Sequence, residues 1–268
     1  NEHGKAHRHL SKMVRSWKNN AGVGMGGLLV DTLTHRFLSN HEEYDNIGLS
    51  DFNKLCRDFF QYLKDEPKKD HYQALGSGQD VKVKHYFQNK AKTAYRKAIT
   101  AVEEDDEEKK HNAWREIFGR QFPKSEQVVA KNQMFSESQS DQEEFIEDKY
   151  SIDIKYGLKL DCEIKRDGFR ESLLSRILAE GHRISRVRSL DFIFQTDVPE
   201  PYDVKWKARN VGEEAIRRNC LRGQIIESNK HPNIRHESAD FRGPHYMECY
   251  IIKNSIVVAR DKIEVPIE

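Results

Sequence analysis

The stretch IDIKYGLKLDCEI, residues 152–164, decides the fold class of this chain. Its apolar residues stand at every second position, which is the period of a β-strand or hairpin with one buried face. Before residue 123 the apolar residues instead recur every three or four positions, the period of an amphipathic helix. The sequence therefore predicts an α+β protein with a helical part followed by a β-rich part.

The helical part is predicted to span residues 1–123. Its first helix carries Leu10, Met13, Val14 and Trp17 on one face. Further helices are expected at residues 28–38, 52–63, 87–102 and 113–118, with Ser50 capping the one at 52–63 and Gly119 ending the last. This half shows no strand pattern.

Two further regions follow. Residues 124–149 are polar, rich in Ser, Gln and acidic residues, which favours an exposed linker. The β-rich domain is predicted to span residues 150–268, with helices near 169–180 and 213–221. Later strands are expected at 189–195, 203–208, 224–227, 245–252 and 256–265, and the turn Lys253-Asn254-Ser255 joins the last two.

Composition excludes several classes of protein. With 45 Lys and Arg against 44 Asp and Glu, the net charge is +1, so no global attraction to nucleic acid or membrane is expected. No apolar run approaches the roughly 20 residues that span a bilayer, and no signal peptide is visible. The four cysteines lack metal-ligand spacing and indicate reduced thiols in a cytoplasmic protein. Because the chain opens on Asn1, we expect it to be a fragment.

Glycine-rich segments give two candidate phosphate contacts. GVGMGG at residues 22–27 would bare backbone N–H groups at a helix start, close to Arg15, but it lacks a P-loop ending and also suits a tight helix–helix turn. Gly76-Ser77-Gly78 resembles the Gly-Ser pair of a nucleotidyltransferase site without the carboxylates that should follow it, so a structural turn is expected.

Acidic and cysteine pairs of the second half are weaker candidates for chemistry. Asp161 and Glu163 could form a metal pair, but they are expected to face solvent, opposite the apolar face of their strand. His245 and Cys249 would stand roughly 13 Å apart on one strand, too far for proton transfer. A polar pocket is the stronger hypothesis, because indole, guanidinium and amide groups suit a base or a phosphate. Its candidate residues are Trp206, Arg209, Asn210, Arg222, Glu237 and His245. The alternative is a buried tryptophan among ordinary surface charges.

Several strings resemble a known family in order and spacing. In the first half they are LSKMVRSWK at 10–18, GGLLVDTL at 26–33, YQALGSGQ at 72–79, KAKTAY at 90–95, WREIFG at 114–119 and Phe122-Pro123. These resemble bacterial SMODS nucleotidyltransferases, the cGAS/DncV-like synthases of cyclic oligonucleotides. WKARN at 206–210, LRG at 221–223 and GPHYMECY at 243–250 resemble the AGS-C sensor domain that is often attached to such enzymes.

The resemblance implies a palm domain, absent here, that carries the catalytic carboxylates and holds Mg²⁺ or Mn²⁺. No catalytic or metal-binding residue is therefore expected in this chain. The positions of Arg15, Gly26 and Gly27 match those that contact the triphosphate in the family, although relatives carry a Ser where Gly26 or Gly27 stands, and Leu28 replaces a stacking aromatic.

Implied partners are NTPs, the palm domain, and a sensor ligand or activator protein, with no membrane. The implied role is synthesis of cyclic oligonucleotide second messengers in anti-phage signalling. A nucleotide-binding receptor or a protein-interaction module without catalysis is the alternative, and the sequence leaves the oligomeric state open.

Overall fold

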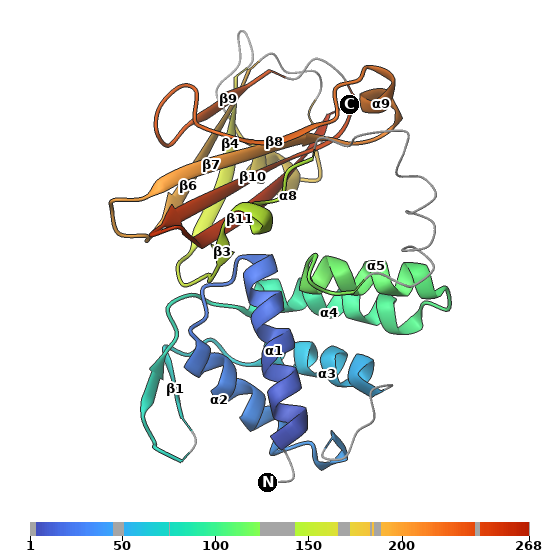
Figure 1. Cartoon of the computed structure of the whole chain (residues 1–268), viewed down its shortest axis with the longest axis vertical. Coiled ribbons are helices and arrows are strands. Elements are labelled where there is room, and N and C mark those ends of the chain that lie inside the picture. The colour runs from blue at the N-terminus through green and yellow to red at the C-terminus, as the bar shows by residue number, and fades with distance from the viewer. Residues whose placement is uncertain are drawn as a thin grey trace. The chain divides into compact units, whose positions relative to one another are not determined.

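A computed structural model describes residues 4–44, 51–74, 76–123, 143–165, 172–182, 184, 189–238 and 242–267. The chain divides into two compact units, Asn1–Ser140 and Asp141–Glu268, which we call the helical unit and the sandwich unit. Figure 1 shows helices in the first and mainly strands in the second, so the predicted α+β class is confirmed.

The helical unit is built from amphipathic helices around one core. Its elements are α1 (Gly4–Ala21), α2 (Gly27–Leu38), η1 (Glu42–Tyr44), α3 (Phe52–Asp65), α4 (Gln88–Glu103) and α5 (Glu107–Phe118). Helix α1 packs along α2 and α5, and α4 lies against both α3 and α5. Trp17 is fully buried and meets the ring of Phe60 at 5.2 Å between centroids. Small buried residues on α4, Ala91, Ala94, Ala98 and Ala101, let its neighbours approach closely.

Helix α5 begins six residues before the expected start at 113. The carboxylate of Asp106 accepts a hydrogen bond from the backbone N–H of Lys109 at 2.9 Å, which caps the helix there. Ser50, predicted to cap the helix that is now α3, lies outside the described residues.

The helical unit also contains a short hairpin, so the prediction of no strands in this half was wrong. Strands β1 (His71–Gln73) and β2 (Asp80–Lys82) pair antiparallel, with Gln73 opposite Asp80. Each strand buries a single side chain, Tyr72 or Val81, which is too short a pattern to show alternation. Gly76 and Gly78 lie in the connecting turn with φ of +84° and +63°, conformations that glycine adopts without strain.

The described strands of the sandwich unit form two sheets. One has the order β3 (Ser151–Ile152), β11 (Ile256–Ile267), β10 (Gly243–Lys253), β7 (Asp203–Asn210), β8 (Arg222–Ile226). The other has the order β5 (Ser172–Leu173), β4 (Leu158–Lys165), β6 (Ser189–Thr196), β9 (Arg235–Glu237). Short helices α7 (Ile146–Lys149), α8 (Leu174–Ala179) and α9 (Glu213–Arg217) complete the unit.

An apolar core joins the two sheets. Cys162 and Phe192 of the four-stranded sheet share it with Trp206, Cys249 and Ala259 of the other sheet. Figure 1 shows the orange-to-red strands β7, β10 and β11 overlying the yellow β4 and β6. The arrangement is a β-sandwich, in which alternate residues of each strand face the partner sheet.

The stretch that predicted the fold class serves both sheets. Residues 151–152 form β3 at the edge of one sheet, whereas β4 begins at Leu158 in the other. The chain changes sheets near Gly157, whose N–H donates to the carboxylate of Asp197 at 2.8 Å. The alternation therefore spans β3 and β4, which belong to different sheets. These residues form neither one continuous strand nor a hairpin.

The remaining boundaries follow the predictions more closely. Lys253, Asn254 and Ser255 join β10 to β11 as predicted, with φ of +52° at Asn254 and +61° at Ser255. Helices α8 and α9 are shorter than expected, and β9 was not predicted. No described helix is long and apolar enough to cross a bilayer.

Candidate functional site

A cavity of about 210 Å³ opens between the two sheets of the sandwich unit. Side chains from both sheets line it. The apolar ones are Leu190, Phe192, Ala208, Met247, Val265 and Ile267, and the polar group contains Asn210, Cys220, Arg222, Glu237, Ser238, His245 and Tyr246. The cavity therefore combines an apolar wall with a small polar cluster, as small-molecule sites do.

An ion pair bridges the sheets at this cavity. Arg222 of β8 donates from Nη1 and Nη2 to the two carboxylate oxygens of Glu237 on β9, at 2.6 and 3.0 Å. Arg235 donates from Nε to the same carboxylate at 2.8 Å. Burial opposes ionisation of Glu237, but the hydrogen bonds from Arg222 and Arg235 outweigh it and lower its pKa. Two guanidinium groups share one carboxylate, which leaves one positive charge in excess.

The backbone at Arg222 is held in an unusual conformation. Arg222 has φ of +59°, the left-handed region that non-glycine residues rarely adopt, and Gly223 follows at +120°. The pairing of β7 with β8 shifts register between Lys207 and Arg209, next to this point. The carbonyl of Arg222 accepts from Nη1 of Arg209 at 2.8 Å, so the strained residue is fixed from the neighbouring strand.

His245 and Asn210 form a second polar pair at the cavity. They are direct cross-strand neighbours on β10 and β7, with 2.9 Å between Nδ1 of His245 and Oδ1 of Asn210. Because the Asn210 amide donates to the carbonyl of Cys220 at 2.6 Å, its oxygen is the acceptor and His245 donates. Asn210 thus orients the imidazole.

The pocket predicted from sequence is only partly present at the cavity. Asn210, Arg222, Glu237 and His245 do come together at the cavity. Trp206 is instead fully buried in the core, where its Nε1 donates to the hydroxyl of Ser228 at 2.9 Å. Arg209, an odd-numbered residue of β7, lies on the opposite face of the sheet and pairs with Glu143. The prediction that these two line the pocket was wrong.

Arg15, Gly26 and Gly27 come together at the start of α2 in the helical unit. Nη2 of Arg15 lies 2.7 Å from both carboxylate oxygens of Asp31, and this pair is partly exposed. A Cβ added to Gly27 would lie 3.8 Å from that nitrogen, with nothing closer. Asp31 was not predicted, although a carboxylate four residues after Gly27 could have suggested it.

The predicted exposure of Asp161 was wrong. Its carboxylate is buried and accepts hydrogen bonds from the backbone N–H of Ser175, at 3.0 Å, and from the Ser175 hydroxyl. Helix α8 covers this side of β4, so both faces of the strand are occupied. No three His, Cys, Asp or Glu side chains of the described residues lie together in a way that could hold a metal ion.

Comparison with known proteins identifies the sandwich unit. Residues 140–268 match the family model of the adenylyl/guanylyl and SMODS C-terminal sensor domain. The match includes both sheets and the cavity. No curated protein matches the chain. Residues 140–268 belong to the adenylyl/guanylyl and SMODS C-terminal sensor domain family, which is associated with adenylyl/guanylyl cyclase-like or SMODS nucleotidyltransferases.

Proposed function

We propose that this chain is the C-terminal part of a nucleotidyltransferase that makes cyclic oligonucleotide second messengers from NTPs in anti-phage signalling. In this proposal the cavity of the sandwich unit binds a phosphate-bearing nucleotide that controls the enzyme. The sensor-domain match supports the association with nucleotidyltransferases. The observation that favours this ligand is the guanidinium of Arg222 in the cavity lining, whose carboxylate partner Glu237 is also held by Arg235.

The carboxylate of Glu237 is shared between Arg222 and Arg235. A phosphate that takes Arg222 away from Glu237 would leave that carboxylate paired with Arg235, so no buried charge would be stranded. Arginine also offers a planar fork that matches phosphate oxygens. An anionic ligand can therefore enter at a small electrostatic cost.

The size and lining of the cavity suit part of a nucleotide. Its volume of about 210 Å³ is below the roughly 300–1,000 Å³ typical of drug-sized pockets. Phe192 and Met247 offer apolar surface for a base, and His245 offers a hydrogen bond. One base or one sugar phosphate would fit, with the rest of a larger nucleotide outside.

Arg222→Gln should weaken binding of a phosphate-bearing ligand about 10- to 100-fold, because a charge-assisted contact contributes about 1.5–3 kcal/mol. Isothermal titration calorimetry of the full chain with 5′-AMP, 5′-GMP, cyclic di-AMP and inorganic phosphate measures this. Arg217→Gln on α9 is the matched control, since Arg217 forms only an exposed pair with Glu214 among the contacts described for it. Heats equal to buffer with every probe, or equal losses in both variants, would contradict the cavity assignment.

We further propose that Arg15 contacts the NTP triphosphate, with the backbone N–H groups of Gly26 and Gly27 as further donors. The partly exposed pair with Asp31 holds the guanidinium at the helix start, where the positive end of the helix dipole favours anions. Mg²⁺ or Mn²⁺ would be held by carboxylates of the palm domain in the complete enzyme, and the described residues supply no such cluster.

In the complete enzyme, Arg15→Ala should raise the NTP KM about tenfold or more, or abolish turnover, through loss of a charge-assisted contact. Lys12→Ala is the control, because Lys12 is an exposed cation one turn away on the same helix. Mass spectrometry of reactions with the four NTPs and Mg²⁺ or Mn²⁺ measures the product. Unchanged kinetics would reject the Arg15 assignment, whereas nucleotide binding without any product would favour the receptor alternative.

A further inference from the structure

Residues 143–149, which we call the clasp, lie on the outer face of the five-stranded sheet, the face opposite the cavity. The backbone N–H of Glu144 donates to the carbonyl of Gly223 at 3.0 Å, and its carboxylate accepts from the N–H of Ile225 at 2.7 Å. Ile146 is fully buried in a second apolar cluster with Tyr250. Residues 143–149, which were predicted to belong to the linker, are therefore packed as part of the sandwich unit.

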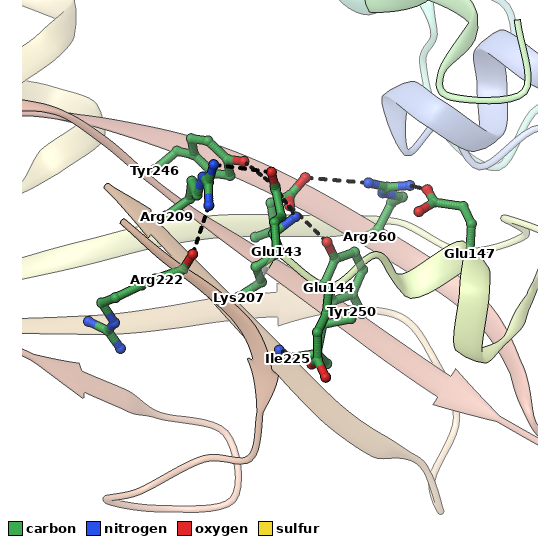
Figure 2. Close-up of polar contacts among 11 residues, drawn as sticks. Glu143, Glu144, Glu147, Lys207, Arg209, Arg222, Ile225, Tyr246, Tyr250 and Arg260 are labelled. Atoms are coloured by element: carbon green, nitrogen blue, oxygen red, sulfur yellow. Dashed lines mark hydrogen bonds and ion pairs between the residues drawn. The ribbon is translucent and has the colours of Figure 1, made fainter. Parts of the chain in front are cut away.

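Acidic side chains of the clasp pair with basic side chains of the sheet, as Figure 2 shows. Glu143 lies 2.6 Å from Nζ of Lys207 and 3.4 Å from Nη2 of Arg209. Glu147 lies 2.8 Å from Nη1 of Arg260. Lys207 is only 3% exposed, so the clasp provides the charge that a buried ammonium group requires.

The cavity and the clasp share one stretch of backbone, Arg222-Gly223. On the cavity side, the guanidinium of Arg222 binds Glu237. On the clasp side, the carbonyl of Arg222 accepts from Arg209, which also pairs with Glu143 (Figure 2). A Cβ at Gly223 would lie 3.2 Å from both Nη1 of Arg209 and Cγ of Glu143, so the packing here leaves little free space.

We propose that the clasp responds to occupancy of the cavity through Arg222 and Gly223. A ligand that draws Arg222 away from Glu237 allows the residue to leave its left-handed conformation, and the two carbonyls that hold Arg209 and Glu144 then move. The free energy of clasp docking changes as a result. By thermodynamic linkage, docking of the clasp changes the free energy of ligand binding by the same amount. In sequence, the clasp begins three residues after Ser140, the last residue of the helical unit. The proposal rests on the proposed ligand function of the cavity.

A test without ligand separates this proposal from the proposed function. Glu237→Gln weakens the hold on Arg222 while it preserves side-chain shape. In the full chain, amide hydrogen exchange of Glu144 and Ile225 should rise about fivefold, the effect expected when about 1 kcal/mol of hydrogen bonding is lost. Amides of the β4–β6 pairing serve as the internal reference and should not change.

Glu227→Gln is the matched control, because it also replaces a paired carboxylate, that of Glu227 with Lys205 of β7, at a position just after the end of β8. Equal exchange rates at Glu144 and Ile225 in both variants would overturn the proposal. In the reverse direction, Glu143→Gln should raise exchange of the Asn210 amide, which donates to the carbonyl of Leu221 beside the cavity. If Glu237→Gln fails to melt cooperatively, Arg222→Lys replaces it with the same expected result. Calorimetry that shows no nucleotide binding would reject the ligand function and leave these exchange results valid.

Discussion

Glu143→Ala is expected to lower the free energy of unfolding of the sandwich unit by about 3 kcal/mol, at the lower end of the cost of breaking a buried ion pair. The substitution leaves the ammonium group of Lys207 buried with Glu248, which lies 3.6 Å away and is also 3.4 Å from Arg260. Urea unfolding followed by circular dichroism and tryptophan fluorescence measures the change. Glu227→Ala, an exposed partner of Lys205, should cost about 1 kcal/mol or less.

A double replacement separates the buried charge from the packing. Glu143→Leu combined with Lys207→Met removes both charges and keeps apolar volume, so it should recover most of the stability lost in Glu143→Ala. The aromatic ring of Phe145, which Lys207 approaches to 4.5 Å, would pack against the methionine. A double variant as unstable as the single one would show that the clasp is held by contacts other than this pair.

The sequence indicates the fold class but does not predict that the clasp packs on the sheet, because periodicity reports only local burial. Helical period before residue 123 and alternation after residue 150 follow from which face of each element is buried, and that information is local. Glu143 and Glu147 look like part of a solvated linker because their partners, Lys207, Arg209 and Arg260, lie more than 60 residues away in sequence. Complementary charges on distant segments leave no periodic signal.

The same limit applies to the candidate site. Asn210, Arg222, Glu237 and His245 were grouped from the chemistry of their side chains, and the structure brings these four to the cavity. Strand alternation already separates Arg209 from Asn210, since neighbours on one strand face opposite sides. Applied to β7, this rule could have removed Arg209 from the predicted pocket. The burial of Asp161 could not be predicted in this way, because it depends on α8 covering the second face of β4.

Trp206→Ala should lower the free energy of unfolding of the sandwich unit by about 3–5 kcal/mol, the cost of deleting a buried indole from a packed core. Trp206 is fully buried between the sheets, its ring centroid is 5.9 Å from that of Phe194, and its N–H is satisfied by Ser228. Urea unfolding followed by circular dichroism measures the loss. Trp206→Phe should cost less, because it keeps most of the apolar contact and loses one hydrogen bond.

Comparison with Arg222→Gln decides between a structural role and ligand contact for Trp206. Since Trp206 does not line the cavity, Trp206→Phe should lower the unfolding midpoint and leave the affinity for a phosphate-bearing nucleotide within about twofold of the parent. Arg222→Gln should weaken that affinity far more. The opposite result, an unchanged midpoint with lost nucleotide affinity in Trp206→Phe, would place the indole in the binding site and require a different arrangement of β7.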